Sequence, residues 1–327
     1  MALREITEPV ELCLPSGKLN PSAVGFSRRP LHETNLQGWG RNKRWEYWGV
    51  ISPTHIIGMT ISDLDYCRVH QLYVYDRASG EEIIGNVLAV GSASTLLPDQ
   101  RPPVDASMSA KKLSLRFCDS GTSTALNARS DRVQLDLVAD ASPESLSVVV
   151  PWSDNRFQYT VKDVSRPITG SVTIDGKRTN LEGGESWGVL DRGRGKWPYS
   201  LTWNWGAGSG IADGHHLGLQ VGGKWTDGTG STENAFFVDG HMTYWPEPVE
   251  WDYDKDDWNS PWRVAGANVD AVLTPFHVRD AVTNAGIIAS ATHQAFGVWS
   301  GEATDGQGST YSLDGLVGWV EQAKNRW

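Results

Sequence analysis

Short segments with the periodicity of β-strands, separated by turn-forming residues, run through almost the whole chain. Segments of this kind lie at residues 70–76, 111–117, 131–139, 145–150, 157–161, 170–176 and 216–222. Each alternates apolar and polar side chains or stays apolar over the length of a strand. Asp-Gly pairs begin at residues 175, 213, 227, 239, 305 and 314, and they favour hairpin turns because glycine tolerates a positive φ. The pattern predicts an all-β protein of sandwiches or barrels rather than βαβ units.

The chain of 327 residues is long enough for two domains. We expect two consecutive antiparallel β-barrels or sandwiches with little helix, one over residues 1–195 and the other over residues 196–327. The boundary between the two domains is predicted to within about 20 residues on either side, since boundaries are harder to predict than the elements themselves. The one helix that we expect is a short segment within residues 320–326.

Charge and composition exclude some classes of protein. A formal net charge of -10 argues against a nucleic-acid partner, since such proteins present a basic face. Cys13, Cys67 and Cys118 form neither a metal-binding spacing nor an even disulfide set, so we expect buried thiols. The first residues lack a signal-peptide pattern, and no run reaches the roughly 18 apolar residues that a membrane-spanning helix needs. The sequence therefore predicts a cytoplasmic protein without a transmembrane segment; its oligomeric state cannot be read.

Tryptophan is unusually frequent, with 16 in the chain. The segment from residue 187 to residue 205 reads as two strands and a turn, and it carries Asp191 among aromatic residues. Trp203 and Trp205 share one face of their strand because successive side chains alternate, and Asn204 points to the other face. These rings either form the wall of a binding pocket or fill a closed barrel. Asp191 is either a buried acid or one partner of a solvated ion pair with Arg192 or Arg194.

Further candidate residues lie downstream. Residues 213–242 hold histidines and acids, among them His216 and Glu233, but no metal-ligand spacing, so we expect no metal. The glycine-rich stretch at 222–230 lacks the spacing of a phosphate loop, and we expect no cofactor. The acids between Asp252 and Asp257 predict a solvated loop rather than a calcium site. His293, on an expected strand, is the best candidate for a general acid or base outside the Asp191 region.

Several strings together resemble a bacterial family called domain of unknown function 2804 (DUF2804). They are ELCLPSGKLNP, SRRPLHETNL, KRWEYW, VVVPWSDNRFQYT, GVLDRGRGKWPY, TWNWG, GGKWTDGTGSTENA, DDWNSPWR and HQAFGVWSG. The match runs from about residue 9 to the final residue and names no activity. A more distant similarity is to the lipocalin-like carotenoid hydratases and AttH-type calycin relatives, in the pattern Trp187, Asp191, Trp203, Trp205, Asp213 and Gly214. That resemblance implies two lipocalin-like barrels that bind or convert lipophilic molecules without a cofactor.

These observations lead to one main hypothesis and two alternatives. The main hypothesis is a pocket for an isoprenoid-like or lipid-like molecule, lined by Trp187, Trp197, Tyr199, Trp203, Trp205, Trp225, Glu233 and Trp299. In its enzymatic version Asp191 protonates an alkene, the aromatic faces stabilise the cation, and His293 or His216 positions water for a hydration, cyclisation or isomerisation. The alternatives are a non-catalytic lipid or pigment carrier, which needs no acid, and a carbohydrate-binding protein with exposed tryptophans.

Overall fold

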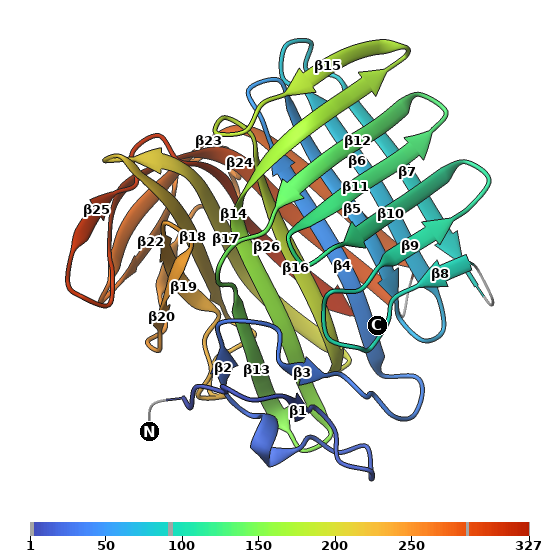
Figure 1. The fold of residues 1–327 in the computed structure, drawn as a ribbon, viewed down its shortest axis with the longest axis vertical. Coiled ribbons are helices and arrows are strands. Elements are labelled where there is room, and N and C mark those ends of the chain that lie inside the picture. The colour runs from blue at the N-terminus through green and yellow to red at the C-terminus, as the bar shows by residue number, and fades with distance from the viewer. Residues whose placement is uncertain (1–2, 91–93, 286–287, 327) are drawn as a thin grey trace.

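The computed structural model is built almost entirely of antiparallel strands (Figure 1). It describes residues 3–90, 94–285 and 288–326, with side chains described throughout except at 283–288. Over these residues the helical structure is confined to a single turn of 3-10 helix, η1 (Pro21–Ala23). The all-β fold expected from the periodicity is confirmed.

The first large sheet has 14 strands, and its main path runs β7-β6-β5-β4-β16-β14-β12-β11-β10-β9-β8. These strands are β4 (Asn42–Ile51), β5 (His55–Asp63), β6 (Arg68–Asp76), β7 (Glu82–Ala89), β8 (Ser94–Leu96), β9 (Ala106–Ser109), β10 (Leu113–Asp119), β11 (Ser123–Ser130), β12 (Val133–Asp140), β14 (Arg156–Ile174) and β16 (Trp187–Lys196). Beside the path lie β2 (Phe26–Ser27), β13 (Leu146–Ser153) and β15 (Lys177–Leu181), and a separate parallel pair joins β1 (Val10–Glu11) to β3 (His32–Glu33).

The second large sheet has 10 strands in the order β20-β19-β18-β17-β26-β24-β23-β22-β21, with β25 beside β24. The strands are β17 (Ser200–Ala212), β18 (His215–Gly223), β19 (Asn234–Val238), β20 (His241–Trp245), β21 (Glu250–Asp252), β22 (Trp262–Gly266), β23 (Val269–Ala285), β24 (Ile288–Thr304), β25 (Thr310–Ser312) and β26 (Val317–Arg326). The chain passes from the first sheet to the second between Lys196 and Ser200. The expected division into two domains near residue 195 stays a prediction.

One long strand, β14, folds the first sheet back on itself. Its first part pairs with β13 and β16, and its second part pairs with β12 and β15. The register shifts between Asp163 and Arg166, where Ser165 takes a φ of 60°, and such a bulge bends a strand. The two segments expected as separate strands at 157–161 and 170–176 are therefore one strand. Its bend divides the sheet into an inner half, from β7 to β16 with β13, and an outer half, from β12 to β8.

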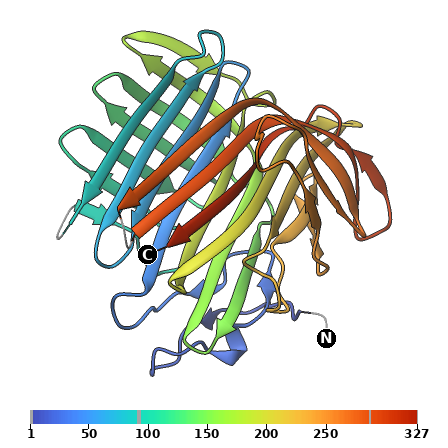
Figure 2. The same ribbon diagram turned by 180° about the vertical axis from the view of Figure 1, so that it is seen from behind.

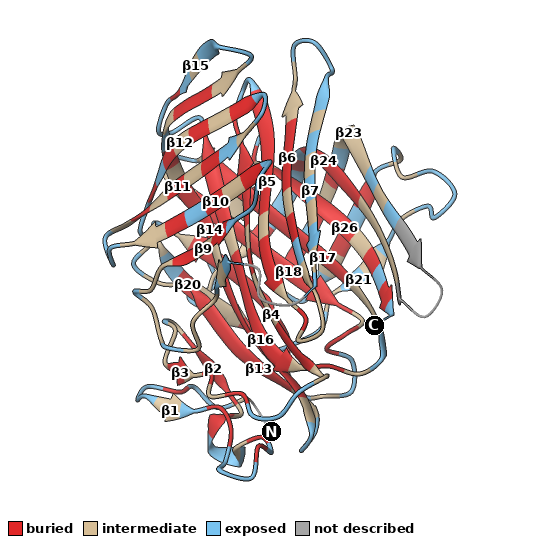
Figure 3. Cartoon of the chain, turned by 90° about the vertical axis from the view of Figure 1, so that its right-hand side faces the viewer, coloured by how far each residue is buried: buried red, intermediate tan, exposed pale blue. Residues whose placement is uncertain are grey.

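The inner half lies between the other two layers, and apolar side chains fill both contacts. On one face, residues such as Trp48, Val50 and Met59 pack against Leu115 and Leu135 of the outer half. The other face packs against the second sheet, whose strands cross it in Figure 2, through residues that include Ile51, Val189, Trp205, Phe296 and Trp319. The second sheet curls around a core of its own, which contains Leu219, Trp262 and Trp299. Figure 3 shows the buried residues concentrated along these contacts.

Three of the Asp-Gly pairs form the tight hairpins that the sequence predicts. Asp175–Gly176, Asp213–Gly214 and Asp239–Gly240 join β14 to β15, β17 to β18 and β19 to β20. The aspartates have φ values of 48°, 53° and 52°, and the glycines have values of 82°, 80° and 80°. Two consecutive positive φ angles define the type I′ turn, which matches the twist of the strands it joins.

The helix expected within residues 320–326 is wrong, because this segment belongs to β26. It forms a central strand of the second sheet, hydrogen-bonded to β17 on one side and β24 on the other. Val320 and Ala323 are buried, and Glu321 is 7 % exposed. Helix formers such as Glu, Gln, Ala and Lys dominate the local sequence, but pairing along both edges outweighs their intrinsic preference.

The cysteines agree with the expectation only in part. All three thiols are free; Cys13 is buried, while Cys67 and Cys118 are half-buried. Burial raises the pKa of the Cys13 thiol to about 11, so this thiol behaves as a small apolar side chain. As for membranes, the described residues contain no helix with the length and hydropathy needed to cross a bilayer.

Candidate functional site

Two rows of polar and aromatic side chains face one another across the interface between the sheets. In the inner half, the register aligns Tyr47 of β4, Asp191 of β16 and Lys162 of β14. In the second sheet it aligns Trp205 of β17 with Glu321 of β26 and Gln294 of β24. Side chains of aligned residues share a face of a sheet. The rows meet where the Lys162 ammonium lies 3.9 Å from the centre of the Trp205 ring.

Asp191 is held by donors on both of its oxygens. Trp45 Nε1 donates to Oδ2 at 3.0 Å, and Lys162 Nζ lies 3.2 Å from the same oxygen. Thr160 Oγ1 donates to Oδ1 at 3.1 Å. The residue is 9 % exposed. An indole N–H, an ammonium and a hydroxyl are all hydrogen-bond donors, so both side-chain oxygens of Asp191 have partners although the residue is buried.

The glycine two residues after Asp191 makes room for the Trp45 indole. A Cβ on Gly193 would lie 2.1 Å from Trp45 Cζ2, far inside any allowed contact. Gly193 is aligned with Trp45 in the ladder, one step along from Asp191. The ring therefore crosses the bare backbone of β16 to reach the carboxylate. In the sequence Asp-Arg-Gly-Arg-Gly, the glycines fall on the face of the strand that carries Asp191.

Glu233 reaches the same cluster from the connection between β18 and β19. Trp225 Nε1 donates to its Oε1 at 2.6 Å, and Lys162 Nζ lies 3.5 Å from its Oε2. The latter oxygen has no hydrogen-bond partner among the described residues. Burial raises the pKa of the Glu233 carboxyl to about 7, against the opposing effect of Lys162. Burial also lowers the pKa of Lys162, but Asp191 and Glu233 together raise it above its usual value.

Glu321 is a second buried carboxyl, and the sequence analysis did not single it out. Trp203 Nε1 donates to its Oε1 at 2.9 Å, and Gln294 Nε2 donates to its Oε2 at 3.2 Å. Burial raises the pKa of Glu321 to about 7. Because a glutamine amide offers both a donor and an acceptor, Gln294 can partner either protonation state of this carboxyl. The cluster thus combines the contact between Asp191 and Lys162 with two carboxyls that exchange protons near neutral pH.

Indole rings enclose the cluster at one end of the interface. The group consists of Trp45, Trp152, Trp197, Trp203 and Trp225, whose ring centres lie 5.3 to 6.1 Å from their neighbours. Trp45, Trp152 and Trp203 are half-buried, while Trp197 and Trp225 are buried. The rings touch one another, so they form a packed aromatic cap over the acids. Two hollows, of about 130 and 460 Å³, lie elsewhere, and neither is lined by a tryptophan.

The structure separates the other expected site residues from this cluster. His216 bonds to Ser165 Oγ at 2.7 Å and packs on Trp187, farther along the interface. His293 lies on the opposite face of β24 from Gln294, bonded to Asp280 at 2.6 Å and stacked on Trp258. Trp299 belongs to the core of the second sheet, and Tyr199 is 45 % exposed.

Other expected residues do come together. Trp203, Trp205, Trp225 and Glu233 lie with Asp191, and Trp197 packs beside them while its Nε1 donates to Gln158 at 2.6 Å. Asn204 points away, toward Tyr253, as alternation predicts. Asp252, Asp254, Asp256 and Asp257 are exposed, as expected of a solvated loop. Among the described residues no group of His, Cys, Asp or Glu side chains is arranged to hold a metal ion.

The residues that sequence reasoning missed are Trp45, Thr160, Lys162, Gln294 and Glu321. The partners that they contact in the cluster lie at least 27 residues away in the chain, so spacing carries no signal of their meeting. A weak signal does exist for one of them. Glu321 falls at alternate positions with Trp319 and Ala323. A charged residue on the inward parity of a strand is a candidate for a buried site.

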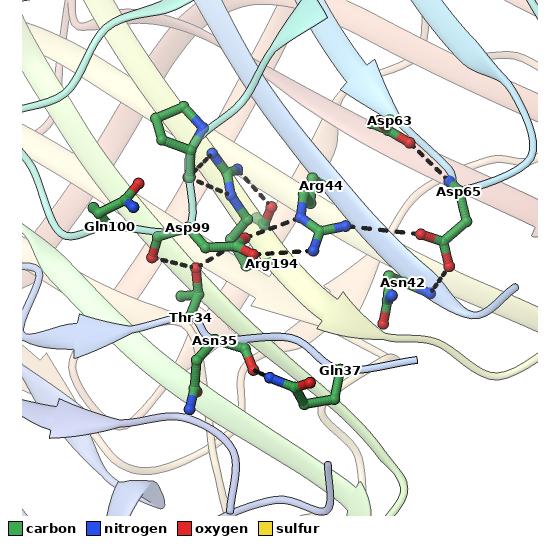
Figure 4. Close-up of polar contacts among 12 residues, drawn as sticks. Thr34, Asn35, Gln37, Asn42, Arg44, Asp63, Asp65, Asp99, Gln100 and Arg194 are labelled. Carbon is green, nitrogen blue, oxygen red and sulfur yellow. Dashed lines mark hydrogen bonds and ion pairs between the residues drawn. The ribbon is translucent and has the colours of Figure 1, made fainter. Parts of the chain in front are cut away.

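The arginines next to Asp191 do not pair with it. Arg192 and Arg194 lie on the other face of β16, where Arg194 Nη2 bonds to Glu46 at 3.0 Å and both arginines donate to the carbonyl of Pro98. Figure 4 shows this network extending through Arg44 to Asp99 and Asp65. The alternative of a solvated Asp191 ion pair with these arginines is therefore wrong.

Comparison with known proteins places the chain in a family. A family profile described as domain of unknown function (DUF2804) matches residues 3–327. The chain belongs to this family. The resemblance seen in the sequence is thereby confirmed. Comparison with curated protein sequences finds no match.

Solved structures share the fold at low sequence identity. Kievitone hydratase from Nectria haematococca is 10% identical, with a TM-score of 0.54 over 88% of this chain and 89% of that one. The protein CghA is 10% identical, with a TM-score of 0.53 over 89% and 90% of the two chains, and it has also been solved with Sch210972. A putative AttH from Nitrosomonas europaea is 13% identical, with a TM-score of 0.53 over 97% and 98%. These structures share the fold of this chain.

Proposed function

We propose that this protein binds a lipophilic small molecule at the interface between its sheets and catalyses a cofactor-free, acid-dependent hydration, cyclisation or isomerisation. The observation that carries the proposal is the cluster of Glu321, Glu233, Asp191 and Lys162 beneath the aromatic cap. Two of its carboxyls titrate near neutral pH because they are buried. Buried ionisable groups are costly, and such clusters are more frequent at functional sites than elsewhere.

In this proposal Glu321 is the proton donor. It is 7 % exposed, whereas Glu233 is 1 % exposed and lies behind Lys162. For a hydration, the Glu321 carboxyl protonates one alkene carbon and a carbocation forms at the other. Water then adds to the cation, and the proton that this water loses returns to the Glu321 carboxylate. A donor with a pKa near neutrality is present in both forms during such a cycle.

The aromatic residues supply the stabilisation that a carbocation needs. The ring face of Trp205 already holds a cation, the Lys162 ammonium. The negative face of an indole attracts positive charge within about 6 Å of the ring centre. Asp191 holds Lys162 in place in this scheme, so the role assigned to Asp191 is positioning rather than proton donation. Kievitone hydratase and CghA support a catalytic function because they share the fold, although low identity transfers no residue roles.

The test begins with the ligand. Native mass spectrometry of the protein purified from its own host would identify a co-purifying lipophile. That molecule, incubated with the protein in heavy water, should gain carbon-bound deuterium, which nuclear magnetic resonance detects. Glu321→Gln should abolish this incorporation, and Glu302→Gln, an exposed carboxyl on β24, is the matched control. Full incorporation with Glu321→Gln would remove this residue from the mechanism. A bound lipophile that never gains deuterium would identify a carrier.

Asp191→Asn gives a second arm of the test. The change removes the counterion of Lys162 while keeping the shape of the side chain. Turnover should fall strongly because the freed ammonium lies beside the developing cation, while binding of the lipophile should change little. Equal turnover of this variant and the wild type would mean that Asp191 does not position Lys162 for the reaction.

The carbohydrate alternative receives less support. A sugar-binding surface needs exposed, flat indole faces. Among the residues that pack around the cluster, the indoles are buried or half-buried and make edge contacts with one another. Trp39 is exposed at 76 % but stands apart from the cap.

A further inference from the structure

Arg279 of β23 lies at the end of the interface opposite the aromatic cap. It is aligned with Gln294 in the second sheet, so it continues the row that contains Glu321 and Trp205. Its guanidinium donates to Gln71 Oε1 and lies 4.2 Å from the centre of the Tyr73 ring. Among the residues whose side chains are described, no carboxylate forms an ion pair with it. Arginine that is half-buried and unpaired is uncommon, because burial favours pairing.

An exposed apolar strip lies on the face of the first sheet that carries Gln71 and Tyr73, the two residues that Arg279 contacts. Val69 of β6 is aligned with Leu88 of β7, and Tyr73 is aligned with Ile84. Val69, Ile84 and Leu88 are 39 %, 52 % and 71 % exposed, and Val90, beyond the end of β7, is 82 % exposed. Alternation places these side chains on the face that carries Gln71 and Tyr73. Figure 3 shows exposed positions along β7 beside buried strands.

Arg279 also lies close to Tyr47, which connects it to the acid cluster of the proposed site. A Cβ on Gly58 would lie 3.6 Å from both Arg279 Nη1 and Tyr47 Oη. These two atoms therefore lie on either side of the glycine, above the same stretch of β5 backbone. Tyr47 is half-buried, and its ring contacts Trp205 edge to face at 5.8 Å. Tyr47 is aligned with Asp191. The polar row thus leads from Arg279 past Tyr47 to the acids.

We propose that this end of the interface binds a lipophilic carboxylate, with its head group on Arg279 and its apolar chain on Val69, Ile84 and Leu88. The planar fork of a guanidinium matches a carboxylate in two parallel hydrogen bonds. The exposed strip offers the apolar area that a hydrocarbon chain would cover. Because the whole protein is acidic, with a net charge of -10, an anion needs a local cation to be attracted here.

This inference rests on the proposed function only in one respect, the path to Glu321, and it deepens that function by naming a substrate class. Such a molecule carries its reacting carbons at some distance from an acidic head group. The head group would be held at Arg279 while the chain or ring system extends along the interface. Binding at Arg279 is measurable without any reaction, so the two proposals can fail separately.

The test compares decanoate with decanol, which share a chain and differ in charge. Isothermal titration calorimetry on the full chain should show decanoate binding about tenfold more tightly, because a hydrogen-bonded charged head group contributes about that factor. Arg279→Gln should remove this preference and leave decanol binding unchanged. Arg263→Gln, which alters an exposed arginine paired with Asp270, is the matched control and should keep it. Leu88→Ser, at a solvent-exposed position that folding tolerates, should weaken both ligands.

Three results would overturn the proposal. The first is equal affinity for decanoate and decanol in the wild type. The second is an unchanged preference in Arg279→Gln with a native circular dichroism spectrum. The third is a dimer that decanoate does not bind and that Leu88→Ser dissociates in analytical ultracentrifugation, because the strip would then be an interface between copies of the chain. Decanoate binding that persists while Glu321→Gln keeps full turnover would refute the proposed mechanism alone.

Discussion

The two faces of strand β16 bury charge in contrasting ways. On the face toward the outer half, Arg192 and Arg194 meet Glu46 and backbone carbonyls, and neighbouring Arg44 meets Asp65 and Asp99. Cations and anions are balanced there. On the face toward the second sheet, Asp191 shares one ammonium, that of Lys162, with Glu233. Among the described residues, the side-chain donors to the Glu321 carboxyl are neutral groups of Trp203 and Gln294.

This difference separates a structural network from a candidate site. The arginine network pairs its cations with carboxylates and fixes the segment around Pro98 across the sheet; burial lowers the pKa of the Arg194 guanidinium to about 9, which leaves it charged at neutral pH. The acid cluster leaves two carboxyls whose charged forms are disfavoured by burial. Stability alone does not call for such an arrangement, since apolar residues of similar volume would fill the space at lower cost. Proton exchange near neutral pH is what the arrangement provides.

Glu46→Gln should have the largest effect on folding. The change leaves two buried arginines without their carboxylate, and breaking a buried ion pair costs about 3 to 5 kcal/mol. Urea denaturation at pH 7 measures the loss in the free energy of unfolding. A loss in the free energy of unfolding below about 1 kcal/mol is what an exposed ion pair would give. That result would mean that the arginine network is not a buried structural network.

The pH dependence of stability should reveal the acid cluster. The pKa values of Glu233 and Glu321 rise from 4.5 in the unfolded chain to about 7 in the folded protein, so the folded state binds protons more tightly. The raised pKa values stabilise the folded state at low pH. This stabilisation is complete below pH 4.5, is lost as pH rises toward 7, and amounts to at most about 3 kcal/mol for each group.

Buried histidines oppose this trend, because burial lowers the pKa values of His32 and His70 to about 4. The measurement is therefore the difference between the wild type and the double variant Glu233→Gln, Glu321→Gln, followed from pH 4 to pH 8. The wild type should lose stability relative to the variant as pH rises. Parallel curves would show that these carboxyls titrate normally.

Gly193→Ala should disturb only the face of β16 that carries Asp191. The new methyl group would overlap the Trp45 ring and push the indole away from Asp191. Overpacking of this kind costs about 1 to 3 kcal/mol. Tryptophan fluorescence should change while the arginine network stays intact, which a crystal structure of the variant would show. An unchanged Trp45 position would contradict the close approach described for this strand.

The smallest effect is expected for Glu321→Gln measured at pH 4. The carboxyl is protonated there in the folded protein because its pKa is about 7, and glutamine keeps the shape and the acceptor oxygen of a protonated carboxyl. The free energy of unfolding should change by less than about 1 kcal/mol, the range of a single neutral hydrogen bond. Because the same substitution at Glu46 should cost several times more, the pair of variants measures the contrast between the faces directly.

Sequence reasoning recovered the parts of the fold that local chemistry controls. Alternation located strands such as β6, β10, β12, β13 and β18, Asp-Gly pairs located three hairpins, and the common face of Trp203 and Trp205 followed from the period of a strand. It failed at residues 320–326, where pairing on both edges decides the structure. It also named part of the candidate cluster, Asp191, Trp205 and Glu233, and missed Lys162 and Glu321. Trp203 and Glu321, for example, are 118 residues apart in the chain, and only the pairing of β17 with β26 makes them neighbours.

The single passage of the chain between the sheets, from Lys196 to Ser200, has a consequence for how the protein could be assembled. Trp45, Lys162 and Asp191 precede that passage, and Trp203, Glu233 and Glu321 follow it. Neither portion of the polypeptide holds a complete set of groups. Two separately synthesised fragments divided there would each lack part of the cluster, and mixing them would restore it only when their surfaces recognise one another. Docking of the halves is thus itself the step that assembles the cluster.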